Sequence, residues 1–268
     1  MPAAIGNGNV MAIKRRLNYI QRLIATAICY SAFGLGGLLI YAQYPVLGLL
    51  PISIDKKRHY GRRLIHYNFR VFIGLMHRLG IFTYEVHGID KLKAPGQLIV
   101  ANHPTLIDVV FLLSFIPETN CIVRHGLSKN LFTRGPIKTA GYIVNKDPEQ
   151  FIIDCTDTLR QGHSLMIFPE GTRTRPNAPM TFKKGTANIA LRAAAAVRPV
   201  IITCNPPMLQ KGMKWYKIPQ TRPHFIIRVE ESFDITRYLN KEKTIGIQSR
   251  RLTQDLLHYF QQKLEKDN

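Results

Sequence analysis

The segment IVANHPTLID, residues 99–108, joins an apolar run to a histidine and, five residues later, an aspartate. The apolar run is typical of a buried parallel strand, and the carboxyl ends of such strands are where α/β proteins place ligand sites. We expect a helix to begin at Pro104 and to bring the Asp108 carboxylate back to the His103 imidazole. A carboxylate that accepts a hydrogen bond from one ring nitrogen leaves the other nitrogen as a general base. The pair therefore predicts removal of a proton from a substrate hydroxyl.

A second stretch, MIFPEGTRTR at residues 166–175, ends another apolar run with a glycine beside hydroxyl and guanidinium groups. Gly171 allows backbone N–H groups to approach a ligand, and Thr172 adds a hydroxyl. Arg173 matches the geometry of a phosphate, which arginine binds through two parallel hydrogen bonds. We expect Glu170 to orient an arginine, with a direct role toward substrate hydroxyls as the alternative. The stretch predicts a phosphate site at a strand end.

Short β-rich runs alternate with helical stretches after Ile81. Such alternation predicts an α/β fold with a mainly parallel sheet covered by helices. The expected strands are 82–88, 98–102, 120–125, 141–145, 164–170, 199–205 and 224–232. The expected helices are 104–115, 128–138, 148–161 and 184–196, with a helical tail over 234–268 and a Pro-rich, basic loop over 206–223.

The N-terminal region carries a long apolar run, Leu23 to Ile54, with no charged residue. A membrane-crossing helix needs about 20 apolar residues, so this run is long enough to cross once or to enter and turn back. Basic residues flank the run on both sides, which favours a hairpin anchor with both ends on the cytoplasmic face. A buried pair of core helices is the alternative. We expect residues 1–60 to be a membrane-anchoring segment and 61–268 to be the α/β domain.

The net charge of +20, from 37 Lys and Arg against 17 Asp and Glu, favours anionic partners. These include anionic membrane lipids, phosphorylated or carrier-bound substrates, and nucleic acid. The four cysteines are widely spaced and form no CxxC pair, so neither a disulfide framework nor a zinc site is expected.

The two stretches NHPTLID and FPEGTR together resemble the first and third signature blocks of the glycerolipid acyltransferases, the 1-acyl-sn-glycerol-3-phosphate acyltransferase type. Further along, TFKKGTANIA (181–190) is similar to the family's Phe-Lys-x-Gly segment, and VRPVIIT (197–203) to its fourth block. The resemblance covers roughly residues 80–235, and an apolar N-terminal anchor is also usual in the family.

The resemblance implies that His103 is the general base and Asp108 its orienting partner. It further implies that the acceptor's phosphate and glycerol are bound by Glu170, Gly171, Thr172 and Arg173. The family's second block usually ends in an arginine that contacts phosphate, and AGYIVNKD places Lys146 at that position. Lysine keeps the charge but loses the planar fork of arginine, so the departure concerns the acceptor rather than the reaction.

The implied reaction is direct transfer of a fatty acyl group from a thioester to the free hydroxyl of a lysophospholipid such as lysophosphatidic acid. No cofactor is expected, and the co-substrate is acyl-CoA or an acyl carrier protein thioester. We expect the oxyanion to be stabilised by backbone N–H groups near Pro104. The enzyme is expected at the cell membrane, with its active site facing the cytoplasm.

Two alternatives remain from the sequence. The same chemistry fits another acceptor, such as a lyso-ornithine lipid or an aryl-polyene-type lipid. A basic membrane-binding or nucleic-acid-binding protein is the non-enzyme alternative, because Lys and aromatic residues alternate over 211–217. Nucleic acid is the less favoured partner, since no recognised nucleic-acid-binding module is present.

Overall fold

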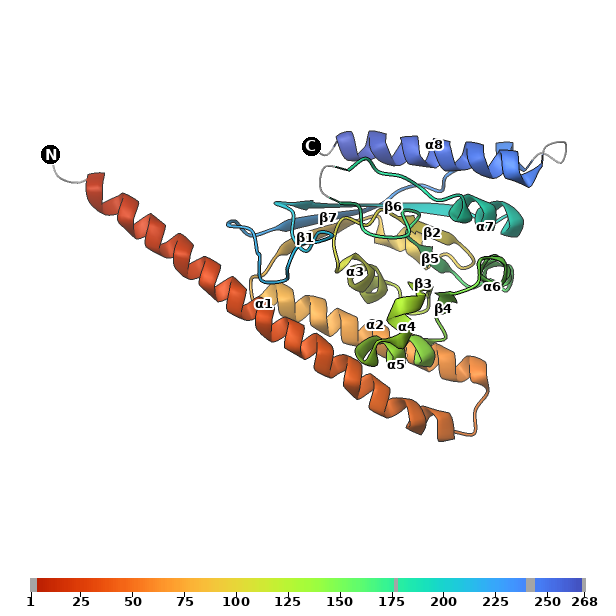
Figure 1. Ribbon diagram of the computed structural model, residues 1–268, viewed down its shortest axis with the longest axis horizontal. Helices are drawn as coiled ribbons and strands as arrows, with labels where there is room; N and C mark the ends of the chain where they lie inside the picture. Colours follow the sequence, from red (N-terminus) through yellow and green to blue (C-terminus); the bar gives the residue numbers. More distant parts are fainter. Residues whose placement is uncertain (1–3, 176–177, 240–243, 267–268) are drawn as a thin grey trace.

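Seven strands form one sheet in the computed structural model, which describes residues 4–175, 178–239 and 244–266 (Figure 1). The strand order is β1-β7-β6-β2-β5-β3-β4. In chain order the elements are α1 (Ala4–Leu49), α2 (Ile54–Arg78), β1 (Thr83–His87), η1 (Ile89–Lys93), β2 (Leu98–Ala101), α3 (Asp108–Phe115), β3 (Asn120–Arg124), α4 (His125–Lys129), α5 (Leu131–Ala140), β4 (Ile143–Asn145), α6 (Pro148–Arg160), β5 (Leu165–Ile167), α7 (Gly185–Ala193), β6 (Val197–Asn205), β7 (His224–Val229), η2 (Thr236–Tyr238) and α8 (Ile245–Glu265).

The sheet is parallel except where β6 pairs with β7, so the predicted fold class is confirmed. All seven expected strands are present, each within a few residues of its predicted bounds. The central strand β2 pairs in parallel with β5 on one side and β6 on the other. Its four residues are all buried, because helices cover both faces of the sheet.

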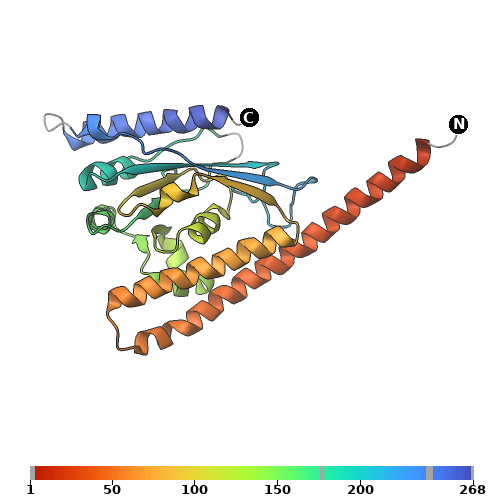
Figure 2. The ribbon, with the colours of Figure 1, turned by 180° about the vertical axis from the view of Figure 1, so that it is seen from behind.

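Two apolar cores lie on opposite faces of the sheet. Residues Ile99 and Ala101 of β2 belong to the core shared with α1, α2 and α3, whereas Leu98 and Val100 belong to the core shared with α6, α7 and α8. This alternation follows from the period of two along a strand. Figures 1 and 2 show α8 and α7 on one side of the sheet and α1, α2, α3 and α5 on the other.

The N-terminal apolar run forms most of α1, one helix that continues through Gly34, Gly36 and Gly37 to Leu49. A turn at residues 50–53 leads into α2, which runs back beside α1 as a helical hairpin (Figure 2). Close contacts in this region depend on glycine. A Cβ at Gly37 would lie 2.3 Å from the carbonyl oxygen of Phe132 in α5, and one at Gly61 would lie 2.3 Å from the carbonyl oxygen of Thr139.

An apolar stripe along α1 is exposed rather than buried. Its members share one helical face: Ile13, Leu17, Ile20, Ile24, Ile28, Leu35 and Leu39. Within the described residues, α1 is also the one helix long and apolar enough to cross a membrane, over Val10–Gln43 with a mean hydropathy of 2.0. Because most of this stretch is exposed, the alternative of a buried pair of core helices is disfavoured.

Some predicted boundaries are wrong. The helix expected over 104–115 begins at Asp108, and the helix expected over 128–138 is two helices, α4 and α5, separated at Asn130, whose side chain caps α5. The helix α2 was not predicted, although its buried residues Ile65, Ile73 and Met76 recur at helical spacing. The predicted boundary between residues 60 and 61 lies inside this helix.

We expect Gly61→Ala to destabilise the protein, because the new methyl group meets the Thr139 carbonyl in the α2–α5 contact. Overpacking of this kind costs about 1–3 kcal/mol. Gly74→Ala is the matched control in the same helix, since a Cβ there meets nothing within 4 Å and alanine favours helix. Thermal unfolding in detergent compares the two. Equal melting temperatures for both variants would contradict the packing argument.

Candidate active site

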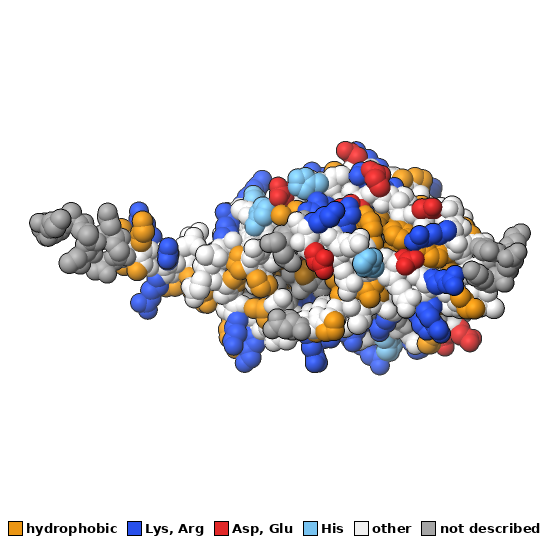
Figure 3. Space-filling model, turned by 90° about the horizontal axis from the view of Figure 1, so that it is seen from above, with side chains coloured by type: hydrophobic (Ala, Val, Ile, Leu, Met, Phe, Trp, Pro, Cys, Tyr) orange, Lys and Arg blue, Asp and Glu red, His pale blue; other side chains and the backbone are white. Residues whose placement is uncertain are grey.

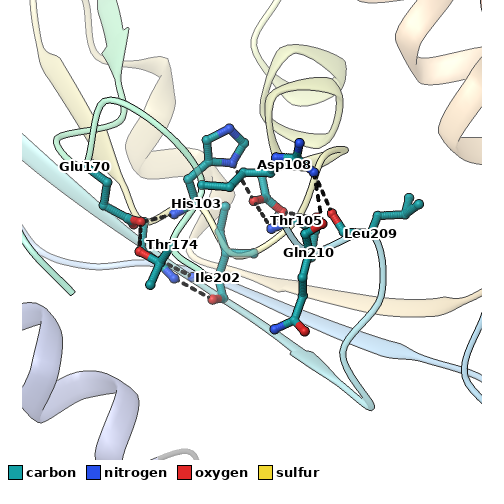
Figure 4. A network of polar contacts seen from close by, with 10 residues as sticks. His103, Thr105, Asp108, Glu170, Thr174, Ile202, Leu209 and Gln210 are labelled. Carbon is teal, nitrogen blue, oxygen red and sulfur yellow. Dashed lines mark hydrogen bonds and ion pairs between the residues drawn. The ribbon is translucent and has the colours of Figure 1, made fainter. Parts of the chain in front are cut away.

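The residue that aligns the end of β2 is Asn102, which directly precedes His103 and is buried. Its side-chain amide donates to the carbonyl oxygen of Ile202 at 2.8 Å, and its side-chain oxygen accepts from the Ile202 N–H at 2.7 Å. Asn102 thus binds the backbone of β6 beyond the last residue of β2 (Figure 4). Sequence reasoning missed this role, because an asparagine after a strand is usually a turn residue.

His103 and Asp108 come together as predicted. The Nδ1 atom of His103 lies 2.9 Å from Oδ2 of Asp108, whose side chain is fully buried, while 15% of the His103 side chain is exposed. With the proton on Nδ1, the carboxylate accepts that hydrogen bond and Nε2 carries a lone pair. The geometry is that of a histidine general base with an orienting carboxylate.

Thr105 holds the Asp108 carboxylate from the other side. Its N–H donates to Oδ2 at 2.7 Å, and its hydroxyl donates to Oδ1 at 2.5 Å. Thr105 is fully buried, so this carboxylate receives protein donors in place of water. The backbone bond joins Asp108, the first residue of α3, to the N–H three residues before it, ahead of the helix. That contact explains why the chain turns at 105–107 and becomes helical only at Asp108.

Phe168 covers the imidazole. The ring centroids of His103 and Phe168 are 4.3 Å apart and the planes differ by 30°, an offset stack. Phe168 follows β5, and this strand is the parallel neighbour of β2, so the two strand ends place the rings together. Asp108 and Phe168 therefore fix the imidazole through one edge and one face.

Glu170 does not contact an arginine among the described residues, contrary to the sequence-based expectation. Its Oε1 accepts from the His103 N–H at 2.8 Å, and its Oε2 accepts from the Thr174 hydroxyl. The side chain is buried, and burial raises the pKa of Glu170 above its ordinary value despite these hydrogen bonds. Glu170 joins the turn after β5 to the backbone that carries the general base.

Arg173 is bound to the loop that connects β6 and β7. Its Nη1 donates to the carbonyl oxygens of Leu209 at 2.9 Å and Gln210 at 3.3 Å (Figure 4). The same Leu209 oxygen accepts from the N–H of Leu106 at 3.1 Å. In the part of the chain that the structure describes, no group accepts from Nε or Nη2 of Arg173, so one edge of the guanidinium remains for a ligand.

The remaining predicted residues divide into near and distant ones. Gly171 and Thr172 lie in the turn after β5, and Gly171 has φ of +68°, which favours glycine. Lys183 packs on Gly171, since a Cβ there would lie 2.9 Å from the Lys183 Nζ. Lys146 follows β4 at the sheet edge, with β5 and β3 between β4 and β2, and its side chain is exposed. The structure thus adds Lys183 as a cation near the turn and sets Lys146 apart.

Three of the backbone N–H groups near Pro104 have partners within the protein. The His103 N–H donates to Glu170, the Thr105 N–H to Asp108 and the Leu106 N–H to Leu209. An oxyanion would therefore need other donors than these three, and its stabilisation by N–H groups near Pro104 stays a prediction.

A model of the Acyltransferase family matches residues 83–203, a span that contains His103, Asp108, Phe168, Glu170 and Arg173 but not the loop residues Leu209 and Gln210. The chain is 29% identical over 121 residues to the 1-acyl-sn-glycerol-3-phosphate acyltransferase of Helicobacter pylori, an alignment with 42% of this chain and 51% of that protein. It is 26% identical over 145 residues to the human 1-acyl-sn-glycerol-3-phosphate acyltransferase beta, with 50% of this chain and 49% of that protein aligned.

The chain spans about half the length of these curated relatives. The fold is also that of a solved structure, the 1-acyl-sn-glycerophosphate acyltransferase of Thermotoga maritima, with a TM-score of 0.65 at 18% identity. That match covers 92% of this chain and 98% of the other, so the shared fold includes the helical hairpin as well as the α/β part.

The raised pKa of Glu170 predicts a pH-dependent stability. The folded protein binds this proton more tightly than the unfolded chain, so the stabilisation is complete below the ordinary pKa of 4.5 and is lost as pH rises through the higher folded value. Glu170→Gln cannot titrate but keeps an acceptor for the His103 N–H. We therefore expect wild-type stability to fall relative to Glu170→Gln with rising pH, measured by thermal unfolding. A difference that is constant across pH would contradict the assignment.

Proposed function

We propose that the protein is a membrane-associated O-acyltransferase that moves a fatty acyl group from a thioester to the free hydroxyl of a lysophospholipid such as lysophosphatidic acid. The observation that carries this proposal is the His103–Asp108 pair, whose Nδ1 and Oδ2 atoms lie 2.9 Å apart. The pair lies inside the span that the Acyltransferase family model matches. The names of the relatives support the acceptor class, since each is a 1-acyl-sn-glycerol-3-phosphate acyltransferase.

The proposed chemistry begins at Nε2 of His103, which accepts the proton of the acceptor hydroxyl. The oxygen attacks the thioester carbonyl and forms a tetrahedral intermediate, whose collapse makes the ester and breaks the C–S bond. The imidazolium returns its proton to the departing thiolate, so the histidine ends as it began. Asp108 stabilises the imidazolium, and Phe168 limits rotation of the ring.

Direct transfer, without an acyl-enzyme, agrees with the raised pKa values of the buried cysteine thiols. Burial raises the pKa of Cys121, Cys155 and Cys204 to about 12, which keeps each thiol protonated at neutral pH. Cys204 is the one near the site, and its thiol donates to the carbonyl oxygen of Pro206 at 3.5 Å. A protonated thiol is a poor nucleophile, so the acceptor hydroxyl is the attacking group.

The acceptor's phosphate and glycerol would bind at the turn after β5, through Gly171, Thr172 and the unoccupied edge of Arg173. Glu170 contributes by holding the backbone of His103, and through it the base, toward that turn. Lys146 is retained as a contact to a more distant part of the acceptor, because its strand ends at the same edge of the sheet.

The membrane part of the proposal rests on α1 and α2. The exposed stripe of α1 is apolar, and α2 exposes cations and tyrosines on one face: Lys56, Tyr60, Arg63, Tyr67, Arg70 and Arg78. This combination suits an apolar anchor beside anionic headgroups. We place the protein at the cell membrane with the site facing the cytoplasm, where acyl-CoA or an acyl carrier protein thioester is the donor.

A second acceptor class is favoured by one residue. Lys146 stands where the family's second block usually carries arginine, so the phosphate geometry differs at that position. A lyso-ornithine lipid or an aryl-polyene-type lipid would use the same His103 chemistry.

We expect His103→Ala to abolish acyl transfer without releasing the protein from membranes. The assay follows thiol release from a long-chain acyl-CoA by detergent-purified protein, with and without lysophosphatidic acid. Loss of a general base lowers the rate by about a hundredfold or more. His163→Ala is the matched control, because His163 is exposed before β5, at the opposite end of the strand. Acceptor-dependent turnover that survives in His103→Ala would refute the base assignment.

Arg173→Ala should raise the KM for lysophosphatidic acid with little change in the KM for acyl-CoA. A charged hydrogen bond to phosphate contributes about 1.5–3 kcal/mol, roughly tenfold or more in KM. Arg175→Ala, an exposed neighbour, is the control. Lys146→Ala measured beside them tests whether the distant cation reaches the same phosphate. An unchanged acceptor KM would remove the substituted residue from the acceptor site.

A further inference from the structure

The loop between β6 and β7, residues 206–223, is called the Lys-Trp loop here. It carries Lys211, Lys214, Lys217 and Arg222 and no acidic residue. Trp215, the single tryptophan of the chain, is 40% exposed, and its neighbour Tyr216 is 43% exposed. The loop therefore presents partly exposed aromatic rings beside cations at the protein surface.

One end of the Lys-Trp loop is bound to α1. Arg22 is 1% exposed, and its guanidinium donates to the carbonyl oxygens of Pro219 at 3.0 Å, Gln220 at 2.6 Å and Thr221 at 3.4 Å. Two turns further along α1, the Tyr30 ring lies 5.5 Å from the Trp215 ring. The Arg22 Nε donates to Asn18 on the same helix at 2.9 Å, and both Nη atoms bond the loop, so this buried arginine fixes the position of the loop on α1.

The other end is bound to the active site. The Leu209 carbonyl accepts from the Leu106 N–H, inside the turn between His103 and Asp108, and from Arg173. The loop therefore runs from the general base to α1, and Trp215 lies between these two attachments in sequence. Figure 1 shows this segment beside the middle of α1.

The neighbours of the loop on α1 indicate what covers it. Ile24 and Ile28 are 56% and 53% exposed and lie on the same turns of the helix as Arg22 and Tyr30. An apolar phase that covers these two isoleucines comes within one helix diameter, about 10 Å, of the Lys-Trp loop. Tryptophan and tyrosine concentrate at the headgroup level of bilayers, and lysines there bind anionic lipids.

We propose that residues 211–217 are a second membrane contact, in which the three lysines bind anionic headgroups and Trp215 lies at the level of the lipid glycerol, next to the active site. This inference rests on the membrane attachment in the proposed function, and it adds a surface outside the apolar helix. Such a contact would place the turn between His103 and Asp108 at the bilayer surface, where a lysophospholipid presents its hydroxyl.

The single tryptophan makes the test direct. Full-length protein is reconstituted into vesicles of phosphatidylcholine with or without phosphatidylglycerol, and Trp215 emission is recorded with lipids brominated at different acyl positions. We expect a blue shift and strongest quenching by bromines near the glycerol. We expect Lys211→Gln/Lys214→Gln/Lys217→Gln to remove about half or more of the increase in Trp215 quenching that phosphatidylglycerol causes.

Two control variants test whether the effect is specific to the Lys-Trp loop. Arg250→Gln/Arg251→Gln/Lys266→Gln removes the same charge from α8 and its C-cap residue. Figure 3 shows Lys and Arg interspersed with Asp and Glu on the upper face of the molecule. Trp215→Phe/Ile247→Trp moves the tryptophan to an exposed position on α8, across the sheet from α1. We expect the charge control to behave as wild type and the moved tryptophan to be unquenched.

The outcomes separate the inference from the proposed activity. Quenching needs no turnover, so His103→Ala should be quenched like wild type even if no acceptor is ever found. Absence of quenching from any bromine position in a vesicle-bound protein would overturn the membrane contact. A Trp215 shift caused by an acidic acyl carrier protein, with none from lipid, would also overturn it.

Discussion

The buried carboxylate of Asp108 is the constraint on which the site depends. An ionised carboxylate without water must be bonded on every side, and here His103 Nδ1, the Thr105 N–H and the Thr105 hydroxyl supply the donors. Removing one hydrogen-bond partner of such a charged group costs about 1.5–3 kcal/mol. The turn between β2 and α3 is therefore held in one conformation, and the imidazole has one orientation. Preorganisation of this kind is what a general base needs, since no rearrangement accompanies proton transfer.

Three neighbouring segments of the chain hold this turn between β2 and α3. Asn102 bonds the backbone of β6, Glu170 brings the turn after β5 to the His103 N–H, and the Leu209 carbonyl accepts from Leu106. The contacts come from β6, from the turn after β5 and from the loop after β6, which is possible because β5, β2 and β6 are adjacent in the sheet. The N–H groups of His103, Thr105 and Leu106 are bonded within the protein and hold the base rigidly.

The strands and the two stretches that form the site, 99–108 and 166–175, could be predicted from the sequence, because continuous apolar runs and the residues at strand ends are local signals. His103 with Asp108, and Gly171 with Arg173, were recognisable from type and spacing alone. The roles of Asn102, Thr105 and Phe168 depend on which strand lies beside β2, and that information is not local. The start of α3 was misplaced for the same reason, since a side-chain contact to Thr105 overrides the preference of proline for a first turn. Helix α2 was not predicted although its apolar residues recur at helical spacing, because its many cations are typical of a solvated segment.

Arg22 links helix α1 to the turn that carries the general base. A charged residue at the start of the apolar run of α1 is expected to face protein rather than lipid, and Arg22 is buried against backbone carbonyls of the Lys-Trp loop. The loop then reaches the turn of the general base through Leu209. On the proposed function, the lysophospholipid keeps its acyl chain in the bilayer and its hydroxyl at the surface, so a base aligned with the surface would meet the hydroxyl without lifting the lipid into water. Each CH₂ kept in the bilayer saves about 0.8 kcal/mol, which favours bringing the site to the lipid over bringing the lipid to the site.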